Sequence, residues 1–466
     1  MDLRAYSMRS TIGWLFALLL VLGACSSGAS SEDLAASVDH AEGPATDPPP
    51  EATEILEEEI AALRGRLPQE APLPIGWSRI PHDEAIFGVA WSGNEMWSVI
   101  SGGPGLVAVG FSGGEDTLSG GERDAAVWTS LDGITWFRVP HDEAVFGGEG
   151  EQTMSSVTVG GPGLVAVGVD GSGYSPDWDA AVWTSVYGLV WSRVPHDESV
   201  FGGGEMRSVT VGGPGLVAVG QEGTGYTDET GPGRQDAAVW TSVDGITWTR
   251  APNDESVFGG PSNQSMVSVT AGGPGLVAVG WDDTNAAVWT SVDGITWSRV
   301  PHDESVFGRV GRPSMVSVTA GGPGLVAVGS DNSDAAVWTS IDGITWSRIL
   351  DHQDVFGEPG LLRMTAVTAT ESSLVAVGFE KPVPLTGILA SEEPQGDIAT
   401  VWTSTDGITW TRVPHDQRAY GAPHGQEMLS VIAWGSGLVA VGHEGGGGVY
   451  HGGYGSLHAA VWVTTP

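Results

Sequence analysis

Two neighbouring segments, MVSVTAGGPGLVAVG (Met315–Gly329) and DAAVWTSIDGITWSRI (Asp334–Ile349), contain the repeating unit of this chain and decide its fold. They hold four short runs with β-strand character: SVTA, GLVAVG, AAVWTS and ITWSRI. Gly-Gly-Pro-Gly joins the first two runs and Asp-Gly joins the last two, and both are strong turn signals. The unit therefore predicts four antiparallel strands in sequence order.

The unit recurs along the chain, and three separate markers give the same count of seven. The first strand has a small residue at its centre, at Ser98, Ser156, Ser208, Ser268, Ser317, Ala366 and Ser430. The third strand carries a tryptophan, at Trp128, Trp183, Trp240, Trp289, Trp338, Trp402 and Trp462. The fourth strand carries another, at Trp77, Trp136, Trp191, Trp248, Trp297, Trp346 and Trp410.

The two ends of the repeat region complement each other. It begins with an isolated fourth strand, IGWSRIP (Ile75–Pro81), and ends after a third strand, HAAVWVTTP (His458–Pro466). Joining these fragments closes a ring and removes the exposed edges of an open array. We therefore expect an all-β fold, a seven-bladed β-propeller of four-stranded antiparallel blades that the N-terminal outer strand closes as three strands plus one. An open β-solenoid is the alternative, but it does not explain the complementary ends.

The turn between the third and fourth strands contains a repeated Ser-x-Asp-Gly-x-x-Trp motif, as in SVDGITW (Ser291–Trp297). It resembles the Asp box, or BNR repeat, of sialidases and related propellers, with one residue fewer between Asp and Gly. Its carboxylates are Asp132, Asp244, Asp293, Asp342 and Asp406, while Tyr187 replaces the Asp in SVYGLVW. Ser and Asp side chains can accept hydrogen bonds from turn amides, Gly takes a positive φ, and Trp packs between blades. We interpret the motif as structural, because a catalytic constellation is built once and not copied around a ring.

A connector of the type RVPHDE follows the fourth strand. Its arginines are Arg79, Arg138, Arg193, Arg250, Arg299, Arg348 and Arg412. FRVP (Phe137–Pro140) is similar to a sialidase motif whose arginine binds the substrate carboxylate, but here the arginine lies on the outermost strand of every blade. The histidines are His82, His141, His196, His302 and His415, with Asn253 and Asp351 as substitutes. We expect the His-Asp-Glu groups to satisfy connector backbone and to pair with the nearby Arg, with a metal or general-base role as the alternative.

In a propeller, the loops after the second and fourth strands share one face. The loop after the second strand varies from WDDTN to FEKPVPLTGILASEEPQG, whereas the turns of the other face are nearly invariant. Because sites usually lie on loops of a rigid scaffold, we place the binding function on the variable face. The candidate binding residues are Asp170, Trp178, Glu222, Tyr226, Trp281, Asp282, Asp331, Glu380 and Glu444. Acids with exposed aromatics suit glycans or basic partner surfaces, and solvated loop ends are the structural alternative.

The last repeat breaks the histidine pattern. His443, His451 and His458 lie in HEGGGGVYHGGYGSLH, and His424 lies on the preceding loop of the same face. With Glu444 they form a candidate transition-metal site, although the spacing is not a known ligand signature. We expect no cofactor.

The N-terminal segment predicts export. Arg4 and Arg9 precede the apolar run TIGWLFALLLVLGA, and LGAC (Leu22–Cys25) resembles the lipobox of bacterial lipoproteins. The resemblance implies cleavage before Cys25 and lipid attachment to its thiol, whereas a plain secretory signal is the alternative. We divide the chain into a lipoprotein signal peptide (1–24), the lipidated cysteine with an acidic, Pro-rich tether and a short helix (25–74), and the propeller (75–466).

Composition excludes one class of partner. The chain has 466 residues, a single lysine and a formal net charge of −38, which repels phosphate backbones and argues against nucleic acid. We expect a monomeric, non-catalytic, extracytoplasmic binding or assembly module, lipid-anchored to the bacterial cell membrane, that recognises a glycan or an envelope protein. The alternative is a sialidase-like or glucanase-like glycoside hydrolase, which needs two carboxylates placed across a cleft.

Overall fold

The computed structural model describes residues 76–464 except for 89–92, 114–122, 172–177, 224–233, 261, 309–310, 350–352, 358–359, 383–395, 417–418, 420–424 and 446–456. The described residues belong to one compact unit, Pro74–Pro466. The predicted signal peptide, Cys25 and the tether lie outside them, as do Tyr226, His424 and His451. Among the described residues, no helix has both the length and the apolar character needed to cross a lipid bilayer.

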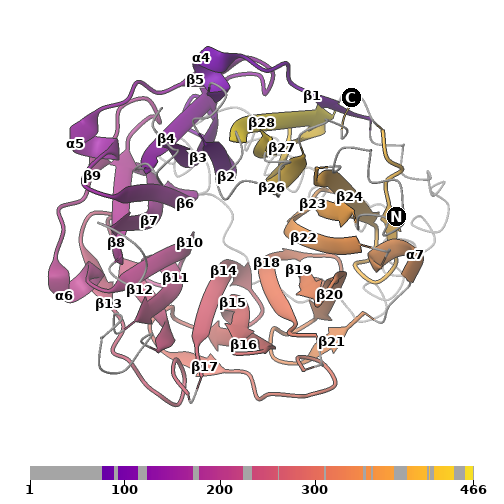
Figure 1. The fold of residues 1–466 in the computed structure, drawn as a ribbon. Helices are drawn as coiled ribbons and strands as arrows, with labels where there is room; N and C mark the ends of the chain where they lie inside the picture. The colour runs from indigo at the N-terminus through magenta and orange to yellow at the C-terminus, as the bar shows by residue number, and fades with distance from the viewer. Residues whose placement is uncertain are drawn as a thin grey trace, which may run out of the picture. The chain divides into compact units, whose positions relative to one another are not determined.

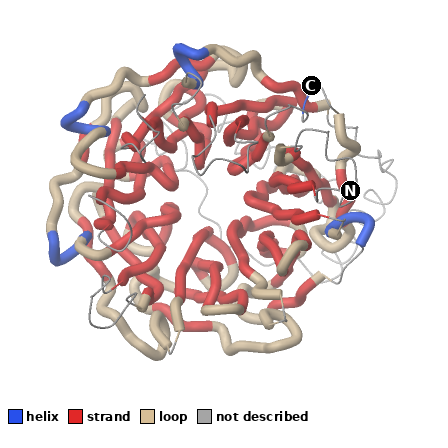
Figure 2. The backbone as a smooth tube through the Cα atoms, viewed as in Figure 1, coloured by secondary structure: helices blue, strands red, loops and turns tan. Residues whose placement is uncertain are grey.

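The described strands form seven four-stranded antiparallel sheets around a central channel (Figures 1 and 2), which confirms the predicted seven-bladed propeller. In each blade the first strand is innermost and the fourth outermost. Blades 1 to 3 consist of β2 (Asn94–Gly102), β3 (Gly105–Gly113), β4 (Arg123–Ser130) and β5 (Trp136–Arg138); β6 (Glu151–Gly160), β7 (Gly163–Gly171), β8 (Trp178–Ser185) and β9 (Ser192–Arg193); and β10 (Gly204–Gly212), β11 (Gly215–Gly223), β12 (Gln235–Ser242) and β13 (Trp248–Arg250).

Blades 4 to 7 repeat this order with small differences in strand length. Blades 4 and 5 consist of β14 (Gln264–Gly272), β15 (Gly275–Asp282), β16 (Asn285–Ser291) and β17 (Trp297–Arg299), and of β18 (Ser314–Gly321), β19 (Gly324–Asp331), β20 (Asp334–Ser340) and β21 (Trp346–Arg348). Blade 6 consists of β22 (Gly360–Ala369), β23 (Leu374–Pro382), β24 (Ile398–Ser404) and β25 (Trp410–Arg412). Blade 7 consists of β26 (Gln426–Trp434), β27 (Gly437–Gly445), β28 (Leu457–Thr464) and β1 (Trp77–Arg79).

Blade 7 closes the ring with strands from both ends of the chain. β1 pairs antiparallel with β28, with Trp77 opposite Thr464 and Arg79 opposite Trp462. The expected closure by three strands plus one is therefore present, and β1 covers the edge of β28 that would otherwise be outermost.

Buried side chains between neighbouring blades form the core. In each interface the two tryptophans of one blade pack against Val and Ala side chains of the blade before it, as Trp128 and Trp136 of blade 1 pack against Val439 and Val441 of blade 7. The first strands are also joined by hydrogen bonds. Ser98 of blade 1 accepts one from the backbone N–H of Val157 in blade 2 at 3.4 Å, and the pattern recurs around most of the ring.

Short helices occupy four of the connectors that follow the fourth strands: α4 (Glu84–Phe87), α5 (Glu143–Phe146), α6 (Glu198–Phe201) and α7 (Gln353–Phe356). In α5 the Asp142 carboxylate accepts a hydrogen bond from the Ala144 N–H at 3.1 Å, which is an N-cap. Phe146, at its end, is buried against the blade core. The aspartate of the predicted His-Asp-Glu series thus starts a helical turn, and a buried phenylalanine holds the connector in place.

The turns between third and fourth strands have the hydrogen bonds expected from their sequence. In blade 5, the Asp342 carboxylate accepts from the N–H groups of Ile344 at 2.8 Å and Thr345 at 2.6 Å, while Ser340 Oγ accepts from Gly343 N–H at 2.8 Å. Gly343 has a φ of 77°, and the Trp346 indole donates to its carbonyl at 2.9 Å. The same bonds recur at Asp132, Asp244, Asp293 and Asp406. The five carboxylates are engaged within their own turns.

Candidate functional site: the central channel

Each first strand contains a β-bulge at the same register. In blade 1 the pairing with the second strand shifts between Met96 and Ser98, so that Trp97 has no partner, and the other six blades shift at the equivalent place. A bulge re-aims the side chain of the extra residue. The methionine before it is buried between blades, so the bulged side chain turns toward the channel.

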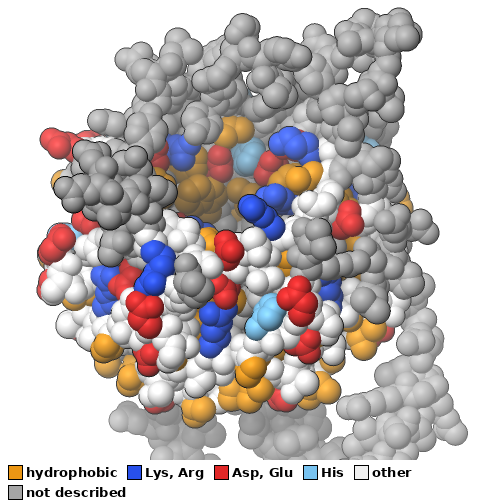
Figure 3. All heavy atoms as spheres, turned by 60° about the horizontal axis from the view of Figure 1, so that its bottom comes forward, with side chains coloured by type: hydrophobic (Ala, Val, Ile, Leu, Met, Phe, Trp, Pro, Cys, Tyr) orange, Lys and Arg blue, Asp and Glu red, His pale blue; other side chains and the backbone are white. Residues whose placement is uncertain are grey.

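The seven bulged residues, here called the bulge ring, all line one cavity of about 810 Å³ at the centre of the propeller. They are Trp97, Ser155, Arg207, Val267, Val316, Thr365 and Leu429. Gly311, Arg312 and Asn332 also line the cavity, and they belong to loops at the variable face. Figure 3 shows a hollow in the molecule, with charged side chains around it and apolar ones deeper. The cavity is therefore at the variable-face end of the channel.

Arginines from blades 3, 5 and 6 reach this cavity. Arg207 forms an ion pair with Glu205, with Nε 3.1 Å from Oε1. No side-chain hydrogen bond or ion pair joins the guanidinium group of Arg312 or Arg363 to any other residue that the structure describes. Arg312 also has a φ of 59°, an uncommon conformation for a residue other than glycine. Two guanidinium groups without a partner among the described residues thus line the cavity in a strongly acidic protein.

Acidic residues gather where blades 6, 7 and 1 meet. Glu427 on β26 lies directly opposite His443 on β27, and both line the cavity with Glu95 and Trp97 of β2. The Trp97 indole N–H donates to Glu95 Oε2 at 2.8 Å, and its ring meets Phe111 edge to face. Burial and a hydrogen bond to Asp397 raise the pKa of Glu427 to about 8. Glu427 is therefore largely protonated near neutral pH.

The six predicted binding carboxylates form ion pairs within their own blades. Each forms an ion pair with the outer-strand arginine of its own blade: Asp170 with Arg193, Glu222 with Arg250, Asp282 with Arg299, Asp331 with Arg348, Glu380 with Arg412 and Glu444 with Arg79. None of the six is among the described residues that line the cavity. These carboxylates attach the short fourth strand to the second strand of the same blade.

These ion pairs correct the predicted partner of the arginines. The arginines were expected to pair with the His-Asp-Glu connector, but their partners lie on the second strand, and Arg193 also covers the Trp183 ring, 5.6 Å from its centroid. The prediction was wrong because the connector aspartate caps a helix. Asp197, for example, caps α6 by accepting a hydrogen bond from the Ser199 N–H at 3.0 Å. The connectors remain polar scaffolds.

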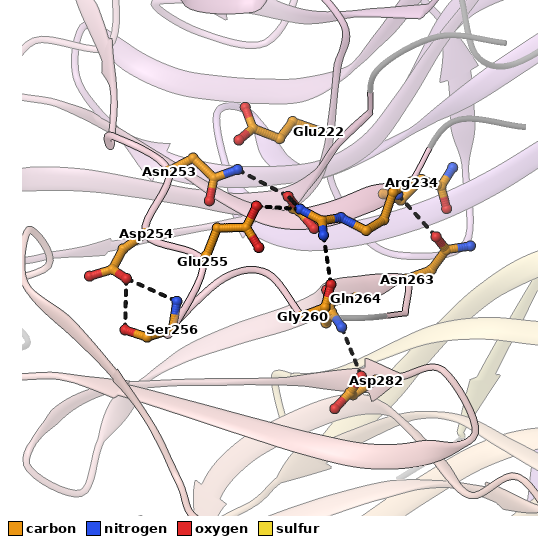
Figure 4. Close-up of polar contacts among 12 residues, drawn as sticks. Glu222, Arg234, Asn253, Asp254, Glu255, Ser256, Gly260, Asn263, Gln264 and Asp282 are labelled. Carbon is orange, nitrogen blue, oxygen red and sulfur yellow. Dashed lines mark hydrogen bonds and ion pairs between the residues drawn. The ribbon is translucent and has the colours of Figure 1, made fainter. Parts of the chain in front are cut away.

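The blade 3 connector, where Asn253 replaces the histidine, has the same scaffold role. Arg234 donates to the Gly260 carbonyl at 2.7 Å and to Asp236 at 3.0 Å, and Asn253 donates to Asp236 at 3.0 Å (Figure 4). In blades 1 and 2 a histidine and two carboxylates approach one another instead, namely Asp124, His141 and Glu143, and Asp179, His196 and Glu198. Because the groups recur at equivalent positions on exposed connectors, we assign them to the scaffold.

Among the described residues, the structure does not bring the predicted aromatic residues to the cavity, and it separates two of the predicted metal-binding histidines. Trp178 and Trp281 are half-buried on the variable-face side, and the described cavity wall does not include them. His443 and His458 occupy adjacent strands, but Glu444 is the partner of His458 and Ala459 the partner of His443. Since successive side chains of a strand alternate, the two histidines point to opposite faces of the sheet. His458 instead packs edge to face against His82.

The bulge ring was missed by sequence reasoning, although the chain contains a signal for it. The glycine of every VAVG run lies opposite the bulge: a Cβ on Gly110 would lie 1.9 Å from the carbonyl oxygen of Glu95, and Gly168, Gly220, Gly280, Gly329, Gly378 and Gly442 are as crowded. A glycine inside a strand marks a bulge or a close backbone approach. The residue between the repeated Met and Ser, which differs in every blade except blades 4 and 5, is the one that the bulge exposes.

No protein-family model matches the chain, and no curated protein matches it. Among solved structures, Sqt1 from Chaetomium thermophilum is similar over 80% of this chain and 96% of that chain, at 11% identity and a TM-score of 0.40. For a Bombyx mori GH32 β-fructofuranosidase, the similarity covers 88% of this chain and 66% of that chain, at 10% identity and a TM-score of 0.32. For a glycosyl hydrolase from Bacteroides ovatus, it covers 53% of this chain and 80% of that chain, at 14% identity and a TM-score of 0.30. Similarity at this distance supports no inference about activity.

Proposed function

We propose that this chain is a non-catalytic, lipid-anchored extracytoplasmic module that binds a glycan in the variable-face end of its central channel. One observation carries the proposal: the seven copies share the Met and Gly framework of the bulge and differ at the bulge ring, which lines a cavity of about 810 Å³. The cavity combines an aromatic platform, Trp97, with charged side chains able to bond hydroxyl groups. The Ser-x-Asp-Gly turns, which resemble Asp boxes, build the scaffold that holds it.

A glycan array with the full-length chain in detergent tests this function. We expect binding to one class of envelope glycan, and a loss of about tenfold in affinity for Trp97→Ala, since a buried aromatic contact contributes over 1 kcal/mol. Ile295→Ala is the control, because Ile295 is exposed on a turn at the opposite face. A silent array would reject glycan binding. Loss with Trp178→Ala and Trp281→Ala, but not with Trp97→Ala, would move the ligand to the outer loops.

The lipid anchor is proposed from the sequence alone. LGAC at Leu22–Cys25 predicts lipid on the Cys25 thiol, and two acyl chains anchor a protein stably. Cys25→Ser should release the chain from the membrane fraction without altering its glycan affinity. A variant that stays in the membrane fraction would contradict the lipoprotein assignment.

A glycoside hydrolase is the second candidate, and Glu427 favours it. Glycosidases of this kind pair a protonated carboxyl group with an ionised carboxylate, and Glu427, with a pKa of about 8, lies in the same cavity as Glu95. Release of a fluorogenic aglycone from sialosides or β-glucosides, abolished by Glu427→Gln, would establish this activity. Equal rates for the wild type and Glu427→Gln would remove it.

A further inference from the structure

A cluster of carboxyl groups lies at the cavity wall, at the seam of blades 6, 7 and 1. We call Glu95, Asp397, Glu427 and His443 the carboxylate pocket: Glu95, Glu427 and His443 line the cavity, and Asp397 is hydrogen-bonded to Glu427. Glu427 and His443 are cross-strand partners on β26 and β27, Glu95 comes from β2 of the next blade, and Asp397 directly precedes β24 of the blade before. Three blades thus place three carboxyl groups and one imidazole together.

His443 contributes a buried ring nitrogen without a hydrogen bond to this pocket. Its side chain is only 11% exposed, and its Nδ1 has no hydrogen-bond partner among the described residues. Nδ1 lies 3.7 Å from Glu95 Oε2, too far for a hydrogen bond between them. Burial lowers the pKa of His443, against the opposing effect of Glu95 and Asp397, so the ring is neutral. In the tautomer that carries its proton on Nε2, Nδ1 is an acceptor that faces a second acceptor, and this tautomer has room for a donor between the two.

The charges around Glu427 indicate that a cation is missing as well. Burial is the main cause of its raised pKa, followed by the hydrogen bond and charge of Asp397 and the charge of Glu95. Among the described residues, Lys381 is the cation that counteracts them, and it is an exposed side chain held by Asp397 at 3.3 Å. Glu427 therefore retains a proton where a bound cation would allow it to ionise.

We propose that the carboxylate pocket binds a primary ammonium group, so that the glycan of the proposed function carries a free amine. An ammonium group has three N–H donors, and Glu95, Glu427 and His443 Nδ1 supply three acceptors. Trp97 lines the same cavity, and a tryptophan ring also attracts cations. Arg312 and Arg363 disfavour a ligand that is cationic along its whole length. Binding converts the Glu427 carboxyl group to a carboxylate, and its proton passes to solvent.

Calorimetry with two matched ligands tests the inference, which rests on the proposed function. The full-length chain in detergent is titrated at pH 7 with a β-1,4-linked N-acetylglucosamine tetrasaccharide that carries a single free amine, at its non-reducing end, and with its fully N-acetylated counterpart. We expect the amine form to bind at least about tenfold more tightly. Across buffers of different ionisation enthalpy, its binding should release up to about one proton per ligand. In Glu427→Gln the proton release should disappear and the preference for the amine should fall.

Controls separate this inference from its alternatives. Glu304→Gln removes a carboxylate from an exposed connector and should change neither quantity. Equal affinity for both tetrasaccharides, or no binding of the amine form, would overturn the ammonium site, while a positive glycan array would leave the proposed function intact. Proton release on adding Zn²⁺ or Mn²⁺ without the amine ligand, together with amine binding that releases no proton, would assign the pocket to a metal. Circular dichroism of Glu427→Gln establishes that it is folded.

Discussion

At the scale of single residues, the turn aspartates are exposed, yet their pKa values are lowered by hydrogen bonds from their own turns. The backbone N–H groups of Thr345 and Ile344 lower the pKa of Asp342 to about 2. A carboxyl whose pKa falls on folding stabilises the fold above its unfolded pKa and loses that contribution as the pH falls through the folded value. We expect Asp342→Asn to lower stability at pH 6, with the difference from wild type vanishing between about pH 4 and pH 2 in urea titrations.

In blade 2 the same prediction can be tested by adding an aspartate to a turn that lacks one. Tyr187 occupies the aspartate position, yet Ser185 Oγ still accepts from Gly188 N–H at 2.8 Å, so the turn is formed without the carboxylate. Tyr187→Asp should therefore raise stability at pH 6 and have no such effect at pH 2. A difference that does not depend on pH in either variant would contradict the charge-assisted turn.

The turn tryptophan should matter for folding and not for binding. Trp297 is buried against residues of blades 3 and 4, and its indole donates to the Gly294 carbonyl at 3.1 Å. Trp297→Ala should cost about 3–5 kcal/mol in denaturant unfolding, the range for a large aromatic removed from a core. Glycan affinity should be unchanged below the unfolding transition. Binding lost from a fully folded Trp297→Ala protein would mean that the turn contributes to the site.

At the scale of the strand, sequence periodicity identified the blades but not the bulge. The β-type runs SVTA and GLVAVG, joined by a Gly-Gly-Pro-Gly turn, predict strands that pair, and that pairing is present. A bulge changes which face a residue occupies, and this depends on the register with a neighbouring strand that periodicity does not record. For this reason Trp97 and Arg207 were overlooked.

The bulge predicts that a glycine opposite it cannot be replaced without loss of stability, and β11 contains both a test position and a control position. In β11 a Cβ on Gly220 would lie 1.9 Å from the Glu205 carbonyl oxygen, whereas on Gly223 the nearest atom would be 3.6 Å away. Gly220→Ala should destabilise the protein by about 1–3 kcal/mol more than Gly223→Ala, because backbone must move. The movement should also shift Arg207 and weaken ligand binding. Equal unfolding free energies for the two variants would show that the bulge tolerates a side chain.

At the scale of the whole molecule, the fold follows from what the seven copies share, whereas the proposed ligand site follows from where they differ. Counting copies gives the ring, because each copy must bury its tryptophans against the next. The ligand site requires the copies to differ, and it consists of residues from all seven blades, brought together only when the ring closes. Glu95 and Glu427 are 332 residues apart in sequence, by the difference of their numbers, yet they line one cavity. Only the closed ring makes blades 7 and 1 neighbours, so the carboxylate pocket depends on closure.

Closure therefore links stability to function, and β1 tests this link. Removing the chain through Pro81 leaves blade 7 with three strands and exposes the edge of β28. We expect this truncation to lower the Tm and to promote association in light scattering, with loss of ligand binding. A circular permutant that joins Pro466 to Ile75 by a short turn, with new ends in the blade 2 loop at 172–177, should keep both Tm and affinity. A truncated chain that unfolds and binds like the wild type would show that the ring does not need its N-terminal strand.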